Sequence, residues 1–185
     1  LTGVFSIAKR LYGLRFEQDA AIPVYHNEVT AYRVFDEHGA FKALLYCDFH
    51  PRPSKREGAW MTSFKTQHKT SQENHRPHIS IVCNFTHPDA EGIALLTFQE
   101  VTTLFHEFGH ALHGMLADTN YPSLSGTNVS WDFVELPSQI MENWCFQKES
   151  LSLFAKHYKS QEPLPPAYLE QIKALKTFQE GMQTL

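Results

Sequence analysis

The chain has 185 residues, enough for one domain with a hydrophobic core. Aromatic residues make up 13% of it and the formal net charge is −4, which excludes a disordered segment and gives no basic surface for nucleic acid. The three cysteines have no Cys-x-x-Cys spacing and no apolar run of about 18 residues occurs, which favours a reduced, cytoplasmic protein that does not enter a membrane.

The first half of the chain predicts a small β-sheet. Residues 29–35 and 41–49 are rich in β-branched and aromatic side chains, and residues 36–39 (Asp-Glu-His-Gly) carry a turn signal between them. These two runs therefore predict a hairpin. Residues 78–85 predict a further apolar strand.

The polar segment 62–77 separates these strands and is predicted to be an exposed loop. It contains His68 and His75. No matching ligand spacing surrounds either histidine, so neither is assigned a metal.

A long amphipathic helix is predicted over about 97–117. Thr97 and Glu100 match the Thr-x-x-Glu capping box, which marks a helix N-terminus. Apolar residues then recur at helical spacing and provide a face for burial, at Val101, Leu104, Phe105, Phe108, Leu112, Met115 and Leu116.

This helix carries the most informative motif of the chain, His-Glu-Phe-Gly-His at 106–110. Helical positions four apart lie on one face, separated by about 6 Å along the axis, so His106 and His110 can aim two imidazoles at one metal ion. Glu107 is rotated by roughly 100° from His106 and can instead reach a water beside the metal as a general base. The pattern is that of zinc hydrolases. The alternative is a histidine-bearing helix without metal.

A catalytic zinc usually has three protein ligands, so a third ligand is needed. Glu135 is the best candidate, because it lies in a segment that predicts a largely buried second helix, where a carboxylate needs a partner. Asp132, about one turn earlier, is a candidate to orient a ligand imidazole. Glu142 shares the same broad face, where an ordinary surface or salt-bridged role is equally plausible. His113 is a rival ligand, but it lies about 10 Å along the helix from His106 and is interpreted as a pocket or packing residue.

The rest of the second half is predicted to be loops and helices. Residues 118–130 are rich in Ser, Gly, Asn and Pro and predict a loop between the two metal-binding segments. Pro137 either begins the second helix or kinks it. Two further helices are expected at about 148–160 and 166–182, separated by a proline-rich breaker.

The sequence resembles the thimet-oligopeptidase-like family of zinc metallopeptidases, whose members include peptidyl-dipeptidases and oligopeptidase A. The resemblance rests first on Leu-Phe-His-Glu-Phe-Gly-His at 104–110, Ser-Gly-Thr-Asn at 125–128 and Asp-Phe-Val-Glu-Leu-Pro-Ser-Gln at 132–139. It extends over most of the chain through Ile-Pro-Val-Tyr-His at 22–26, Gly-Ala-Trp-Met at 58–61 and His-Tyr-Lys-Ser at 157–160.

The resemblance implies one zinc ion per chain, with His106, His110 and Glu135 as its ligands and Glu107 as the catalytic base. It implies an α+β, zincin-like fold, predominantly helical, with a small twisted sheet beside the active-site helix. Residues 58–60 would serve as the edge strand that pairs with substrate backbone; the alternative is a simple turn before a core tryptophan.

The implied activity is hydrolysis of short oligopeptides, as a peptidyl-dipeptidase that releases C-terminal dipeptides. The alternatives are an oligopeptidase A-like endopeptidase and a non-catalytic zinc-binding fragment.

The chain departs from the family in its length. Family members are several times longer, and a glycine-rich loop bearing tyrosine and histidine completes their site. The chain begins at Leu1 and ends within a stretch that predicts a helix, so it is predicted to be a partial catalytic domain over 1–185. We expect a sheet region at about 22–90, zinc helices at about 97–147 and C-terminal helices at about 148–185. The remainder of a parent enzyme would complete the site; no nucleic acid or membrane partner is expected.

Overall fold

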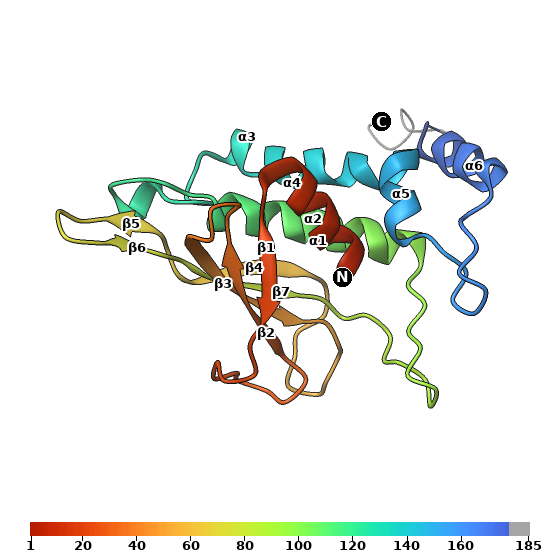
Figure 1. The fold of residues 1–185 in the computed structure, drawn as a ribbon, viewed down its shortest axis with the longest axis horizontal. Helices are drawn as coiled ribbons and strands as arrows, with labels where there is room; N and C mark the ends of the chain where they lie inside the picture. Colours follow the sequence, from red (N-terminus) through yellow and green to blue (C-terminus); the bar gives the residue numbers. More distant parts are fainter. Residues whose placement is uncertain (178–185) are drawn as a thin grey trace.

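The structure, a computed structural model, describes residues 1–177 and consists of a mixed sheet covered by helices (Figure 1). The main sheet contains β1 (Arg15–Gln18), β2 (Thr30–Phe35), β3 (Phe41–Asp48), β4 (Trp60–Lys65) and β7 (His78–Val82). The helices are α1 (Thr2–Tyr12), α2 (Phe98–Met115), α3 (Trp131–Val134), α4 (Leu136–Glu142), α5 (Lys148–Phe154) and α6 (Pro166–Thr177). The predicted α+β class, with a small sheet and several helices, is confirmed.

The strand order of the main sheet is β1-β2-β3-β7-β4. β2 and β3 form the predicted antiparallel hairpin, and β3 pairs with β7 in parallel. β7 is a central strand, and Ile79 and Ile81 on it are fully buried, as expected of an apolar run with neighbours on both sides. β4 is antiparallel to β7 and forms one edge of the sheet. The edge strand therefore lies next to the most buried strand.

Helix α2 lies between the sheet and α4 (Figure 1). Its N-terminus is the predicted capping box: the Thr97 hydroxyl accepts from the Glu100 backbone N–H at 3.2 Å, and the Glu100 carboxylate accepts from the Thr97 N–H at 2.7 Å. Phe105, Phe108 and Met115 are at most 2% exposed. The capping box determines where α2 begins, and the buried apolar face of α2 determines how the helix is rotated against the sheet.

Gly109 allows α4 to approach α2 closely. A Cβ atom at this position would lie 2.5 Å from the carbonyl oxygen of Pro137 and 2.5 Å from the Cα atom of Ser138. Only glycine leaves room for a backbone at this distance. Pro137 lies in the first turn of α4, so it begins this helix and does not kink it.

The segment between β3 and β4 is anchored by a buried ion pair. The Lys55 ammonium donates to the Asp48 carboxylate at 2.9 Å and to backbone carbonyls of His50 and Cys83, and both side chains of the pair are 2% exposed. The Arg52 guanidinium forms two further hydrogen bonds with the same carboxylate, at 2.8 and 2.9 Å. This network fixes the path of the chain into the edge strand β4.

Segment 62–77 is not the predicted exposed loop. It contains most of β4 and a small hairpin of β5 (His68–Lys69) and β6 (Asn74–His75), which extends away from the main sheet (Figure 1). Gln67 is fully buried, and its amide exchanges hydrogen bonds with Thr119. The prediction was wrong because these strands are short and polar, and long-range pairing stabilises them.

The helical predictions for the remaining segments need smaller corrections. α1 and β1 were not predicted from the sequence. The helix predicted to carry the third metal ligand is divided into α3 and α4 and is not largely buried: Phe133 is 47% exposed and Ile140 is 46% exposed. α5 ends at Phe154, well before residue 160. The prediction that the last helix extends to about 182 lies partly outside the described residues.

Loop 118–130 contains one short 3-10 helix, Pro122–Leu124, and is otherwise irregular, as predicted. A second 3-10 helix, Asn143–Phe146, follows α4. Within residues 1–177 no helix combines the length and the apolar composition that a membrane span requires. The three cysteines are buried, and none forms a disulfide within the described residues. The predicted cytoplasmic location stays a prediction.

Candidate metal centre

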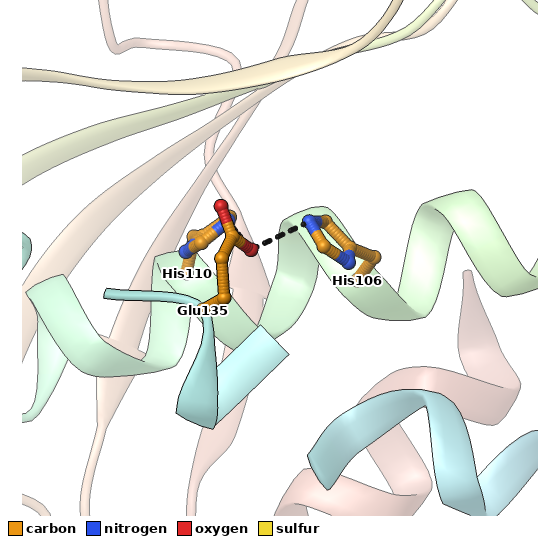
Figure 2. Close-up of side chains that lie close together, drawn as sticks. All are labelled: His106, His110 and Glu135. Atoms are coloured by element: carbon orange, nitrogen blue, oxygen red, sulfur yellow. Dashed lines mark ion pairs between the residues drawn. The ribbon is translucent and has the colours of Figure 1, made fainter. Parts of the chain in front are cut away.

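The structure brings together the three residues that were predicted as metal ligands. His106 and His110 extend from α2, and Glu135 extends from the junction of α3 and α4, so that the three side chains point toward one another (Figure 2). One carboxylate oxygen of Glu135 lies 3.2 Å from Nε2 of His106 and 3.2 Å from Nε2 of His110. One candidate ligand atom from each residue lies within 4.8 Å of the others.

The donor set and the environment of His110 fit a zinc ion. Two imidazole nitrogens and one carboxylate oxygen are a typical protein ligand set of a catalytic zinc. Burial lowers the pKa of His110, although the nearby Glu135 carboxylate acts in the opposite direction. A lowered pKa favours the neutral imidazole, which is the form that binds metal. Nδ1 of His110 is buried and has no hydrogen-bond partner in the described part of the chain.

Glu135 lies at the N-terminus of α4, where the local structure orients its carboxylate. The Ser138 hydroxyl lies 2.8 Å from the carboxylate and 2.7 Å from the backbone carbonyl of Glu135. The hydroxyl hydrogen bond, followed by the two histidines, lowers the pKa of Glu135, with burial opposing. The side chain is 49% exposed, so the expectation of a buried carboxylate was wrong. α3 and α4 cover the site from one side only.

Glu107 is buried beside the three predicted ligands. Burial raises the pKa of its carboxyl group, and the neighbouring Glu135 carboxylate adds to the increase; His106 and a hydrogen bond from the Met61 backbone oppose it. A raised pKa suits a carboxylate that must accept a proton near neutral pH. The predicted base therefore has a suitable environment and lies beside the edge strand.

A pocket of about 590 Å³ opens in front of this group. α2 contributes Glu107 and His110, the chain entering β4 contributes Ala59, Trp60 and Met61, and the segment before α4 contributes Thr127, Asn128, Val129, Trp131, Val134 and Glu135. The pocket thus joins the candidate metal centre to the edge of the sheet. Of its lining residues, those at 127–129 were not predicted individually; the signal was the Gly- and Asn-bearing loop.

Asp132 and His113 lie near the centre without joining it. Asp132 is exposed, and among the described residues no hydrogen bond or ion pair connects it to His106 or His110. Its orienting role therefore stays a prediction. His113 packs against Phe133, with ring centroids 6.0 Å apart, and burial lowers its pKa. It is a packing residue, as predicted.

The sequence did not distinguish a surface role from a salt-bridged role for Glu142, and the structure gives it a partner near the centre. Its carboxylate lies 2.6 Å from Nδ1 of His106. The spacing from Glu135 to Glu142 is seven residues, which is close to two helical turns, so both carboxylates lie on one face. That periodicity was the available signal, but it does not distinguish a histidine partner from solvent.

Comparison with known proteins is consistent with this site. The dipeptidyl carboxypeptidase of Escherichia coli is 43% identical over 181 residues, covering 98% of this chain and 26% of that protein. Oligopeptidase A of Salmonella typhimurium is 40% identical over 184 residues, covering 98% of this chain and 27% of that protein. The organellar oligopeptidase A of Arabidopsis thaliana is 42% identical over 192 aligned positions.

The chain spans about a quarter of the length of these curated relatives. The sequence pattern of peptidase family M3 matches residues 1–185, the whole chain. Together with the relatives, this match shows that the chain belongs to peptidase family M3.

Proposed function

We propose that this chain forms the zinc centre of a zincin-like metallopeptidase that hydrolyses short oligopeptides. His106, His110 and Glu135 would hold one Zn²⁺ per chain, and Glu107 would act as the general base. The observation that carries the proposal is the convergence of His106, His110 and Glu135, whose candidate ligand atoms lie within 4.8 Å of one another, beside a pocket that Glu107, His110 and Glu135 line. Membership of peptidase family M3 supports the reaction class.

A bound zinc ion would supply a Lewis acid that polarises the scissile carbonyl and lowers the pKa of a water molecule. Glu107 takes the proton from the attacking water and transfers it to the nitrogen of the departing amine. Its burial and raised pKa make the carboxylate basic enough to accept the first proton and, once protonated, acidic enough to donate it. Both transfers therefore depend on one side chain.

The edge strand β4 is proposed to bind the substrate backbone. It pairs with β7 along one side, and residues 59–61 line the pocket beside Glu107. An extended peptide can add to such an edge through main-chain hydrogen bonds, which hold the scissile bond in place without reading its side chains. This mode suits unstructured oligopeptides, because they can adopt the extended conformation without first unfolding.

Release of C-terminal dipeptides is the specific activity that we propose, in keeping with the relatives named dipeptidyl carboxypeptidase. Internal cleavage is the alternative, because relatives named oligopeptidase A are nearly as similar. The relatives are about four times as long as this chain. Their additional polypeptide is proposed to complete the substrate site, and the 95% exposure of Trp131 in the pocket wall is consistent with that. A non-catalytic zinc-binding fragment is the corresponding alternative for the chain alone.

The test combines metal content with peptide cleavage. We expect about one zinc ion per chain by elemental analysis. Glu135→Ala should clearly lose zinc, because only two of the three protein ligands remain. A wild-type chain that binds no zinc after reconstitution would contradict the proposed centre.

Glu107→Gln separates metal binding from catalysis. It keeps the shape of the side chain but removes the basic carboxylate, so zinc should remain bound while hydrolysis of a quenched fluorescent peptide falls by at least ~100-fold. Undiminished hydrolysis by this variant would rule out the role of Glu107. Paired substrates with free and amidated C-termini distinguish the two activities, because dipeptide release depends on the free carboxylate and internal cleavage does not.

A further inference from the structure

His106 is contacted at both ring nitrogens, one on each side of the imidazole. Nε2 lies 3.2 Å from the Glu135 carboxylate and Nδ1 lies 2.6 Å from the Glu142 carboxylate. Glu135 precedes α4 and Glu142 is its last residue, and α4 runs antiparallel to α2 (Figure 1). The same short helix therefore places one carboxylate on the metal side of His106 and one on the opposite side.

The contact with Glu142 determines which nitrogen of His106 faces the metal centre. An ionised carboxylate can only accept a hydrogen bond, so Nδ1 of His106 must be the donor. With the proton on Nδ1, the neutral ring has its lone pair on Nε2, the nitrogen that faces Glu135 and His110. The 2.6 Å separation is slightly shorter than the usual charge-assisted N–H···O hydrogen bond of about 2.7–2.9 Å, and such a bond restricts rotation of the ring.

His110 has no equivalent partner. Its Nε2 also faces Glu135, but its Nδ1 is buried without a hydrogen-bond partner among the described residues. Its ring lies edge-on to that of His106, with the centroids 4.9 Å apart. The two histidines are therefore not equivalent: His106 has a preset tautomer and His110 does not.

We infer that Glu142 is a positioning residue that holds His106 in the orientation and tautomer required to bind a divalent cation through Nε2. This inference rests on the proposed metal centre and deepens it. Glu142 does not face the cation itself, because it contacts the far nitrogen of the ring. Carboxylates that orient metal-binding histidines in this way typically change metal affinity by a factor of about 10–100.

The first experiment measures Zn²⁺ affinity by competition with a chromophoric chelator. Glu142→Gln keeps the length of the side chain but replaces the charged acceptor, and we expect zinc to bind ~10–100-fold more weakly. Glu149→Gln is the matched control, because it removes the same charge from an exposed residue in the first turn of α5. It should leave the affinity unchanged. Thermal unfolding of the metal-free variants checks that both are folded.

The second experiment needs no variant. Nuclear magnetic resonance of the zinc-bound, isotope-labelled wild-type chain reports which imidazole nitrogens carry protons. We expect the proton on Nδ1 of His106 to be hydrogen-bonded and to exchange slowly with water. The proton on Nδ1 of His110 should lack a hydrogen bond and exchange faster. A merely structural contribution of Glu142 would not produce this difference between the two rings.

The outcomes separate this inference from the proposed function. Wild-type zinc binding with equal affinity in Glu142→Gln would overturn the inference and leave the metal centre intact. Loss of affinity in Asp132→Asn but not in Glu142→Gln would assign the orienting role to Asp132. No zinc binding by the wild type would overturn the metal centre and the inference together.

Discussion

Replacing Gly109 with alanine should disrupt the proposed metal centre although residue 109 is not a ligand. The added Cβ atom would lie 2.5 Å from the Pro137 carbonyl oxygen and 2.5 Å from the Ser138 Cα atom. Both are backbone atoms of α4, so rotation of a side chain cannot relieve the clash. Restoring the 3.4 Å at which ordinary contact begins requires α4 to move by about 1 Å.

The stability change should be modest and the change in metal affinity large. Overpacking typically costs about 1–3 kcal/mol, and replacing glycine by alanine inside a helix recovers about 1 kcal/mol. The free energy of unfolding should therefore fall by roughly 0–2 kcal/mol. Glu135 begins α4, however, and metal–ligand distances tolerate only about 0.2 Å. A shift of α4 by about 1 Å would remove its carboxylate from the coordination sphere.

Gly114→Ala provides the matched control on the same helix. Its added Cβ atom would approach Cδ1 of Ile79 to 2.7 Å, but this atom is the end of a flexible side chain that can repack. We expect a comparable change in thermal unfolding and an unchanged zinc affinity, whereas Gly109→Ala should bind zinc at least ~100-fold more weakly. Wild-type zinc affinity in Gly109→Ala would refute the reasoning, because it would mean that the close approach of the two helices does not position Glu135.

Two further predictions concern the buried ion pair behind the edge strand. Asp48→Asn leaves the Lys55 ammonium buried without its counter-ion and should lower the free energy of unfolding in urea by about 3–5 kcal/mol, whereas Asp36→Asn, in a more exposed pair, should cost less than about 1 kcal/mol. Burial alone would raise the pKa of Asp48, but hydrogen bonds from Arg52 and Lys55 outweigh it and hold the pKa at about 2. Because this pKa lies below its unfolded value of about 3.9, the charged pair stabilises the protein above pH ~4, and the stabilisation is lost as the pH falls through ~2. The difference in unfolding free energy between wild type and Asp48→Asn should shrink across that interval; a constant difference would contradict the assignment.

Local sequence signals predicted the elements whose stabilisation is local. The capping box at Thr97 and Glu100 fixes the start of α2 through contacts between residues three apart, so the sequence contains all its partners. The four-residue spacing of His106 and His110 places both on one face of the helix for the same reason. The β2–β3 hairpin is likewise specified by its own turn and by the alternation of its strands.

Features that depend on tertiary contacts were missed or predicted incorrectly. β4 is an edge strand with exposed, partly polar positions, and only its pairing with β7 distinguishes it from a loop. The exposure of Glu135 follows from the division of one expected helix into two short ones. The contact between Glu142 and His106 joins residues 36 positions apart, and no local pattern separates it from an ordinary surface carboxylate.

The proposed ligands come from elements of very different intrinsic stability. Two belong to an 18-residue capped helix, whereas the third joins two helices of four and seven residues, which are too short to persist without tertiary support. A cation that bridges them would therefore bind and order the α3–α4 segment in one coupled equilibrium, with part of the binding free energy spent on that ordering. Removal of the metal by a chelator would then loosen residues 131–142 before it affects α2. The segment would lose its protection against hydrogen exchange and proteolysis when the metal is removed and regain it when the metal binds again.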